Sequence, residues 1–214
     1  MKNLKIDIVS DVMCPWCVVG YNNLDAALNE LNDSIQANIE WHAFELNPAM
    51  PKEGQDLREH LMEKYGITEA QSDQNRQNII DRGKESGFEF NFSEKMRMIN
   101  SFDCHRLLTW AKRFDKQTPL KLALFDAHFT TNLDLSDPVQ LLTVVESVGL
   151  DKDAAENVLN SDEFAQDVRE EQNKMQQLGI TSVPTFIVND KYAISGGQPV
   201  AAFKQALTQI SAEM

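Results

Sequence analysis

The sequence predicts an α/β protein in which two small strand-and-helix units are separated by a long helical segment. A strand, a helix and a second strand are expected near the N-terminus, and two strands and a helix near the C-terminus. The residues between these units show helical periodicity and few strand signals. We therefore expect one domain formed by residues 1–50 and 179–214, with an all-helical domain at 51–178 inserted into it.

The N-terminal unit begins with residues 4–9, which alternate and are rich in β-branched side chains, as in a strand. From Pro15 to about Leu31, apolar residues recur at helical spacing. Pro15 suits an early helical position, where its missing N–H is not needed. Residues 35–46 alternate again, so a second strand is expected. A strand, a crossover helix and a strand imply a right-handed connection between parallel strands.

Several helix boundaries are predicted in the inserted segment. Thr68 and Gln71 resemble a capping box, and Thr118-Pro119 and Asp137-Pro138 resemble helix starts. Gly179 is a plausible helix end. Apolar stripes at helical spacing are interpreted as core: Leu120, Leu124, Phe125, Leu141, Leu142, Val145, Val148, Phe164, Val168, Met175 and Leu178.

The C-terminal unit begins with two strand-like segments, residues 185–188 and 191–195. They are expected to form a hairpin that turns at Asn189-Asp190. Gly196-Gly197-Gln198-Pro199 then leads into a final helix with an apolar face, which begins at Val200.

Composition narrows the functional classes. A formal net charge of −13 over 214 residues argues against a general affinity for nucleic acid or anionic membranes. No stretch approaches the length of a membrane-spanning helix, and the start lacks the apolar region of a signal peptide, so a cytoplasmic location is expected. In a reducing compartment, three cysteines indicate chemistry or metal binding rather than a disulfide framework. Nothing in the sequence predicts an oligomeric state.

The stretch that carries the strongest chemical signal is residues 10–17, which contains Cys14 and Cys17 at the start of the first helix. Residues three apart on a helix face the same side, about 5–6 Å apart at Cβ. Modest adjustment brings such sulfurs into disulfide range. Because the closed loop would be tiny, the bond would restrict the unfolded chain little, which favours a reversible redox pair over a structural cross-link.

The two cysteines are expected to have different roles. Cys14 lies where unpaired N–H groups and the helix dipole stabilise a thiolate, so its pKa should fall and it should attack the substrate. Cys17, one turn further in, should be more buried and resolve the mixed disulfide. The main alternative is a zinc site at the two cysteines. Zinc requires about four ligands, and only Cys104 and His105 offer a further pair of ligands.

A second signal lies far along the chain, where Pro184 opens an apolar strand in the segment Ser182–Phe186. A proline there cannot donate a ladder hydrogen bond, so it belongs at a strand start or an edge. The combination of a CxxC motif at the first helix with an apolar-Pro-Thr-Phe segment at the third strand resembles the thioredoxin superfamily. The helical insertion resembles the DsbA family within it.

Four segments carry a closer resemblance, to the FrnE-like branch of the DsbA family. They run through nearly the entire chain: the CPWC motif of residues 14–17, and residues 44–48, 100–106 and 191–199. The resemblance implies a thioredoxin fold with an inserted helical domain. It also implies a thiol–disulfide oxidoreductase that exchanges disulfides, or isomerises them, in a protein or small-molecule substrate. No metal is implied, and glutathione is an option as co-substrate.

The resemblance also implies roles for individual residues. Val183 would offer backbone hydrogen bonds to an extended substrate peptide, and Pro184 would be cis and packed over the active sulfurs. One departure concerns the dipeptide, which is usually Pro-His in DsbA and is Pro15-Trp16 here. The strongly oxidising DsbA potential of about −120 mV is therefore not transferred. Trp16 is expected to be partly exposed, as an apolar platform for a substrate.

Four other residues have two interpretations each. Asn100 and His105 either contact the substrate or thiolate, or anchor the insertion to the thioredoxin core. Cys104 is expected to be a buried small apolar residue, with a third redox thiol as the alternative. His42 is expected to be a surface or packed strand residue rather than a base.

Two other functional classes remain open at this point. The first is a glutathione-dependent enzyme of the 2-hydroxychromene-2-carboxylate isomerase or kappa-class transferase type. Those proteins typically have a serine at the catalytic position and no resolving partner, whereas both cysteines are present here. The second is a non-enzymatic peptide-binding module.

Overall fold

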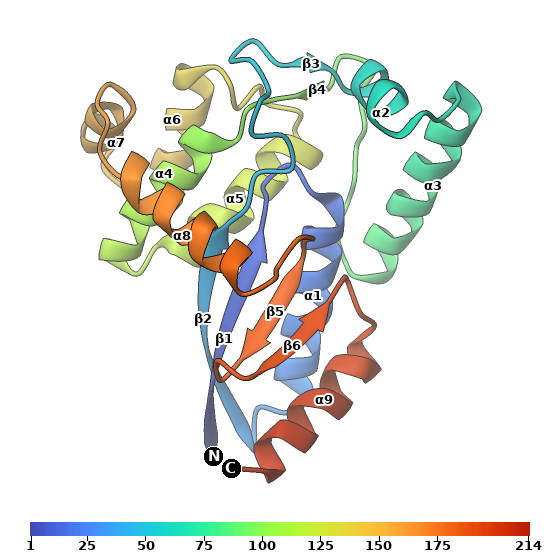
Figure 1. The fold of residues 1–214 in the computed structure, drawn as a ribbon, viewed down its shortest axis with the longest axis vertical. Helices are drawn as coiled ribbons and strands as arrows, with labels where there is room; N and C mark the ends of the chain where they lie inside the picture. The colour runs from blue at the N-terminus through green and yellow to red at the C-terminus, as the bar shows by residue number, and fades with distance from the viewer.

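A four-stranded sheet with the order β2-β1-β5-β6 forms the centre of the structure, a computed structural model that describes residues 1–214 (Figure 1). Its strands are β1 (Lys2–Ser10), β2 (Ile35–Ala43), β5 (Thr185–Val188) and β6 (Tyr192–Ser195). As predicted, β1 and β2 are parallel and are joined by α1 (Pro15–Glu30). Strand β5 runs antiparallel to both β1 and β6, and the predicted hairpin turns at Asn189 and Asp190, which both have positive φ.

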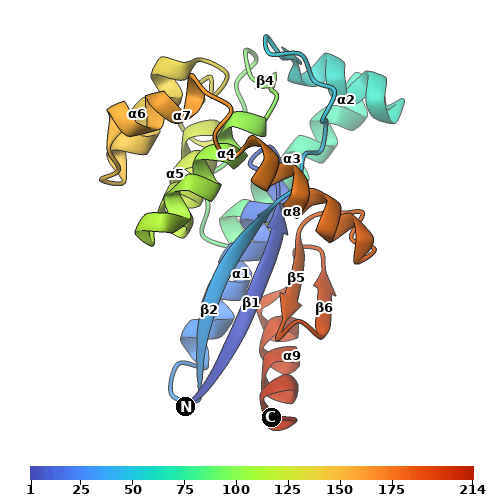
Figure 2. The same ribbon diagram turned by 60° about the vertical axis from the view of Figure 1, so that its left-hand side comes forward.

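Helix α1 packs against α9 (Val200–Ala212), and together they cover one face of the sheet (Figures 1 and 2). Both helices bury apolar stripes against strands that are themselves apolar. Phe186 of β5 and Phe203 of α9 are fully buried, with ring centroids 4.9 Å apart in an edge-to-face arrangement. Burial of these faces fixes α1, and with it the start of that helix, against the end of β1.

The remaining elements gather at the end of the sheet where β1 and β2 finish, and both chain termini lie at the opposite end (Figure 1). Helices α2 and α3 form one arm, and α4 to α8 form another. These elements are β3 (Gln55–Asp56), α2 (Leu57–Tyr65), α3 (Glu69–Glu85), β4 (Arg97–Met98), α4 (Phe102–Ala111), the 3-10 helix η1 (Lys112–Phe114), α5 (Gln117–Phe129), α6 (Pro138–Ser147), α7 (Lys152–Leu159) and α8 (Ala165–Gln177). None of the helices combines the length and apolar composition that crossing a lipid bilayer requires.

Several local predictions are confirmed. Thr68 and Gln71 form the capping box that starts α3. The Asp137 side chain accepts a hydrogen bond from the Val139 N–H at the start of α6, where Pro138 occupies the first turn. Gly179 follows the end of α8 with φ of +79°, the left-handed conformation in which glycine commonly ends a helix.

Three details differ from the predictions. The insertion is not entirely helical, because β3 and β4 pair across it and the Arg97 guanidinium donates to backbone carbonyls of Glu53 and Gly54. Helix α5 begins at Gln117 rather than after Thr118. Pro119 is tolerated in the first turn, because backbone N–H groups there have no partner within the helix. Leu178 is 62% exposed because it lies at the C-cap of α8, past the buried stripe.

Gly20 is the point where α1 comes closest to the loop that precedes β5. A Cβ atom at this position would lie 3.0 Å from Cζ of Phe186, 3.1 Å from Cγ of Pro184 and 3.2 Å from Cα of Gly197. These distances are shorter than ordinary carbon contacts, which lie near 3.5–4.0 Å. The absence of a side chain at Gly20 therefore lets the proline-bearing loop pack against α1, three residues after Cys17.

We predict that Gly20→Ala destabilises the fold by about 1–3 kcal/mol, because the added methyl group overpacks this contact. Helix propensity alone predicts the opposite, a gain of roughly 0.5–1 kcal/mol when glycine is replaced inside a helix. Urea unfolding measures the difference. Asp25→Ala, on the exposed side of α1, serves as the control and should change stability by less than about 0.5 kcal/mol. A stabilised Gly20→Ala protein would contradict the packing argument.

Candidate active site

Cys14 occupies the N-cap of α1, directly after the turn that follows β1. Its backbone is extended, with φ −100° and ψ 109°, and its carbonyl accepts a hydrogen bond from the Cys17 N–H at 3.0 Å. The helix starts at Pro15, as predicted. Both cysteines are free thiols in this structure. Cys14 is 4% exposed and Cys17 is fully buried, so the predicted difference in burial is present.

The thiol of Cys14 faces a cleft of about 1030 Å³ between the start of α1 and the arm formed by α2 and α3. Pro15 and Trp16 line the cleft on the α1 side, and Trp16 is 40% exposed. The opposite wall includes Lys64, Tyr65, Arg76, Ile79 and Arg82. Cys17 does not line the cleft. A substrate in this space therefore reaches the sulfur of Cys14 first.

The loop before β5 borders the same cleft. The Val183–Pro184 peptide bond is cis, and the Val183 carbonyl accepts a hydrogen bond from the Cys14 thiol at 3.8 Å. Val183 lines the cleft, whereas Pro184 is buried beneath it and faces Gly20 of α1. Residues about 170 positions apart in the sequence are thus brought together at the cysteine pair.

The two buried thiols influence each other's ionisation, and their pKa values shift in opposite directions. The hydrogen bond with Cys17 and burial together raise the pKa of Cys14 well above its ordinary value. Burial also raises the pKa of Cys17, but the neighbouring Cys14 thiol, the charge of Lys121 and the polar groups of Ser10 and Asp11 outweigh it and lower that pKa. From the helix start alone Cys14 is expected to be the more acidic thiol, whereas the pKa shifts of the reduced pair run in the other direction. The reason is that the buried stabilising groups surround Cys17.

A buried polar cluster lies behind the cysteine pair. Asp11 is 1% exposed, and its carboxylate accepts hydrogen bonds from the N–H groups of Met13 at 3.3 Å and Leu46 at 2.7 Å. Nε2 of His105 lies 3.4 Å from Oδ1 of Asp11, outside hydrogen-bond geometry. Burial raises the pKa of Asp11, but His105 and the Leu46 N–H outweigh it, so the pKa is lowered and the carboxylate is charged.

Sequence reasoning did not identify Ser10, Asp11 or Lys121 as part of this site. Lys121 belongs to α5 and is 1% exposed. A signal for it was available, because Lys121 lies within the apolar stripe that includes Leu120, Leu124 and Phe125. A charged residue inside such a stripe is almost never fully buried without a partner, and so marks a candidate functional position.

Asn100 and His105 do not line the cleft. The Asn100 side chain donates to the Met50 carbonyl at 2.8 Å and accepts from the Phe102 N–H at 2.9 Å, which orders the start of α4. His105 is 2% exposed and faces Asp11. Both positions fit the anchoring interpretation. Cys104, on the same helix, is fully buried, and burial raises the pKa of its thiol.

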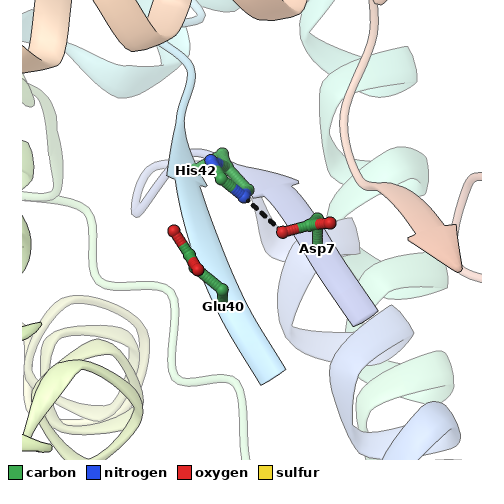
Figure 3. A group of neighbouring side chains, drawn as sticks. All are labelled: Asp7, Glu40 and His42. Atoms are coloured by element: carbon green, nitrogen blue, oxygen red, sulfur yellow. Dashed lines mark hydrogen bonds and ion pairs between the residues drawn. The ribbon is translucent and has the colours of Figure 1, made fainter. Parts of the chain in front are cut away.

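A second buried charged cluster joins the insertion to the sheet, and Figure 3 shows its members on the sheet, Asp7, Glu40 and His42. Nε2 of His42 lies 2.7 Å from Oδ1 of Asp7, and its Nδ1 lies 2.8 Å from Oε1 of Glu171 on α8. Asp7, Glu40 and His42 together have metal-compatible spacing, with ligand atoms within 4.8 Å. Asp7 and His42 are, however, already paired with each other, and Lys5 also pairs with Asp7 at 3.0 Å. His42 is therefore a packed strand residue, as one of the two expectations had it, and it also lies between two carboxylates, those of Asp7 and Glu171.

Comparisons with known proteins agree with this geometry. The family model for a DSBA-like thioredoxin domain matches residues 5–208. A probable DsbA oxidoreductase from Streptomyces coelicolor, SCO1869, is 30% identical, with a TM-score of 0.92 over 99% of this chain and 91% of that one. The uncharacterized protein YwbO of Bacillus subtilis is 26% identical over 207 residues, 96% of each chain. The predicted thioredoxin fold with a helical insertion is confirmed.

A more distant structure shares the fold alone. The cytosolic disulfide reductase DsbM from Pseudomonas aeruginosa, solved with GSH, is 16% identical, with a TM-score of 0.67. The matched regions cover 96% of this chain and 98% of that one.

The His42 cluster predicts a pH dependence of stability. Burial alone would lower the pKa of His42, but its hydrogen bonds with Asp7 and Glu171 raise it to about 9. Because this pKa lies above the value of about 6.5 in an unfolded chain, the stabilisation is complete below about pH 6.5 and is lost as the pH rises through 9. The free energy of unfolding of wild type should exceed that of His42→Gln by on the order of 2–3 kcal/mol at pH 6, and by less at pH 10.

Urea unfolding from pH 6 to 10 measures this difference. His60→Gln is the control, because burial lowers the pKa of His60, so that its titration lies away from the range near pH 9 in which His42 loses its proton. A wild-type advantage over His42→Gln that stays constant from pH 6 to 10 would show that His42 is not a charged partner in the folded protein.

Proposed function

Because this chain belongs to the DSBA-like thioredoxin domain family, we propose that it is a thiol–disulfide oxidoreductase whose Cys14–Cys17 pair exchanges a disulfide with a substrate in the cleft. The observation that carries the proposal is the placement of the two sulfurs. Cys14 faces the cleft at the N-cap of α1, and Cys17 is buried one turn behind it. The attacking thiol, Cys14, must be accessible to the substrate, whereas the resolving thiol, Cys17, needs only to reach the sulfur of Cys14.

The first step in the reducing direction is attack on a substrate disulfide. Cys14 first gives up its proton to solvent at the mouth of the cleft. The Cys14 thiolate then attacks one substrate sulfur, forming a mixed disulfide as the substrate S–S bond breaks. The second substrate sulfur leaves as a thiolate and takes a proton from solvent. The unpaired N–H groups at the start of α1 stabilise the negative charge on Cys14 while it attacks.

The second step releases the substrate. Cys17 loses its proton, and its thiolate attacks the Cys14 sulfur, which breaks the mixed disulfide and forms the Cys14–Cys17 disulfide. The first substrate sulfur departs as a thiol after protonation. Two electrons have passed from the cysteine pair to the substrate, and an external thiol must return them. In the oxidising direction the same steps run in reverse.

Val183 and Trp16 are the proposed substrate contacts. The Val183 carbonyl already accepts a hydrogen bond from the Cys14 thiol, and it can accept one from the backbone N–H of an extended peptide instead. The half-exposed ring of Trp16 offers an apolar surface beside the reactive sulfur. Pro15 completes this wall. A disulfide-bearing peptide, or a smaller disulfide, fits a cleft of this size.

Glutathione is the proposed recycling thiol. The proposal is supported by the similarity of this fold to that of DsbM, a disulfide reductase whose structure was solved with GSH. We also propose that the chain belongs to the FrnE-like branch, on the segments 14–17, 44–48, 100–106 and 191–199. A glutathione-dependent isomerase or transferase is less favoured, because such an enzyme has no use for a buried resolving cysteine at position 17.

Substitution of the cysteines tests the mechanism. Cys14→Ser should lower disulfide reductase activity by at least about 1000-fold, since a serine hydroxyl does not attack disulfides. Cys17→Ser should accumulate the mixed disulfide between Cys14 and the substrate, which intact-protein mass spectrometry detects. Activity is measured with a fluorescent peptide disulfide and reduced glutathione.

Cys104→Ala is the matched control, because this cysteine is buried away from the cleft. Its activity should stay within about twofold of wild type. Full activity of Cys14→Ser would exclude the mechanism. Loss of activity in Cys104→Ala would show that the reaction also depends on Cys104, which contradicts its assignment to Cys14 and Cys17 alone.

Trp16→Ala tests the apolar contact with the substrate. Loss of the ring should raise KM for a peptide disulfide about fivefold, equivalent to about 1 kcal/mol of binding energy, with kcat little changed. Phe114→Ala is the control, because Phe114 is 52% exposed and does not line the cleft. An unchanged KM for Trp16→Ala, or an equal rise for Phe114→Ala, would contradict the assignment of Trp16.

A further inference from the structure

Two histidines, His60 and His128, line the cleft beside Cys14, and they differ in how their rings are held. Nδ1 of His60 lies 2.9 Å from Oε1 of Gln55, and its Nε2 lies 3.1 Å from Oδ1 of Asn47. Both ring nitrogens of His60 therefore have partners in the protein. His128 is 4% exposed, and neither of its ring nitrogens makes a hydrogen bond within the protein.

The ring nitrogens of His128 face open space rather than a closed interior. The side-chain atoms that are both fully enclosed and unpartnered belong to Ser10, Glu45 and His105, and those of His128 are not among them. Since His128 is part of the cleft wall, the space that its nitrogens reach is the cleft. Buried polar side chains generally have a hydrogen-bond partner, so an unpartnered one that lines a cleft points to a ligand.

The end of α5 holds His128 in a fixed place. Its ring packs edge-to-face against Phe129, with ring centroids 4.6 Å apart. The Phe129 carbonyl accepts a hydrogen bond from the Asn91 N–H at 2.8 Å. The Thr130 hydroxyl donates to the Glu89 carbonyl at 2.7 Å, so the chain that follows α3 is tied to the end of α5. A side chain held in this way loses little freedom when it binds a ligand.

The charge state of His128 narrows the chemistry of this ligand. Burial lowers the pKa of His128 to about 4, so its imidazole is neutral near pH 7 and has one N–H donor and one acceptor nitrogen. A substrate carboxylate would form an ion pair only with a protonated ring, which burial opposes. An apolar group would exclude water and leave both nitrogens without a partner. An amide, which has its own donor and acceptor, matches a neutral imidazole.

The surroundings of His128 indicate where such an amide comes from. The wall of the cleft includes Phe92 and Phe129, whose ring centroids lie 6.2 Å apart, and the cleft volume is about 1030 Å³. A space of this size and apolar character takes a ligand with several apolar groups and a few polar ones. A polypeptide that carries a disulfide supplies both, since its side chains are apolar in part and every residue brings a backbone amide.

We propose that His128 is a substrate-binding residue, which forms a hydrogen bond with an amide of a polypeptide whose disulfide Cys14 attacks. This inference rests on the proposed function and names its substrate class, a polypeptide disulfide. His128 takes no part in the transfer of electrons or protons. Because it belongs to α5, the binding energy that it adds comes from the insertion, whereas both cysteines belong to α1 and its N-cap.

Substrate kinetics of variants test this contact. Disulfide reduction is measured with dithiothreitol as the reductant and three substrates: a peptide disulfide, glutathione disulfide and dimethyl disulfide, which has no hydrogen-bonding group. His128→Leu should raise KM for the peptide about fivefold, the effect of losing one hydrogen bond, with kcat little changed. Its KM for dimethyl disulfide should stay within about twofold of wild type.

Two further kinds of variant serve as rescue and control. His128→Asn and His128→Gln keep a donor and an acceptor, and at least one of them should hold KM for the peptide within about twofold of wild type. His60→Gln is the matched control from the same cleft, because the ring nitrogens of His60 are already occupied by Gln55 and Asn47. Its KM should also stay within about twofold.

A second measurement reads the hydrogen bond directly and needs no substitution of His128. Cys17→Ser is trapped as the mixed disulfide between Cys14 and the peptide, and the histidine ring nitrogens are followed by NMR. The chemical shifts of the His128 nitrogens should change when the mixed disulfide forms. Those of His60 should not, since both of its nitrogens have partners in the free protein.

The outcomes separate this contact from the proposed function. If no mixed disulfide forms, the proposed function fails. If it forms while the His128 shifts stay unchanged, the role of His128 is overturned and the proposed function stands. An equal rise of KM for dimethyl disulfide and the peptide in His128→Leu would show a structural effect and overturn that role. A rise for glutathione disulfide that equals or exceeds the rise for the peptide would overturn the assignment to a polypeptide.

Discussion

The site depends on two buried thiols that are held next to each other at the start of α1. A buried thiolate is costly unless donors and cations surround it. Here the neighbouring Cys17 and burial raise the pKa of Cys14, at the start of α1, whereas Cys14 and the charge of Lys121 lower the pKa of Cys17, behind it. Access and charge are thereby separated, because the sulfur that faces the cleft is not the one that is best stabilised.

The cleft beside Cys14 is formed by segments that are distant in sequence from the cysteine pair. The cleft is closed on one side by the Val183–Pro184 loop, which approaches α1 only because Gly20 has no side chain. The other side comes from the insertion, which is tied to the sheet by the buried contact of His42 with Asp7 and Glu171. The first of these contacts is close packing at Gly20, and the second is the set of hydrogen bonds of His42 with Asp7 and Glu171.

Much of this arrangement could be predicted from sequence, since it follows from local patterns. Alternation and helical spacing locate the parallel β1–α1–β2 unit and the β5–β6 hairpin, and the CxxC spacing locates the cysteine pair. The burial of Lys121 beside Trp41 and Phe125 could not be predicted in the same way, because it depends on how α5 packs against β2. For the same reason, the helix dipole alone predicts an acidic Cys14, whereas groups distant in sequence transfer the charge to Cys17. The pair of His42 with Glu171 likewise forms only when α8 packs against β2.

The most direct test of this account is the thiolate absorbance of the reduced wild-type protein, followed as a function of pH. We expect one thiolate per molecule to form below pH 9, the ordinary value for a cysteine, while the second active-site thiol and Cys104 remain protonated until well above it. The absorbance should therefore rise in two separated steps. A single step near pH 9, with Cys14 and Cys17 ionising together, would show that the two thiols do not influence each other's ionisation and would contradict the account.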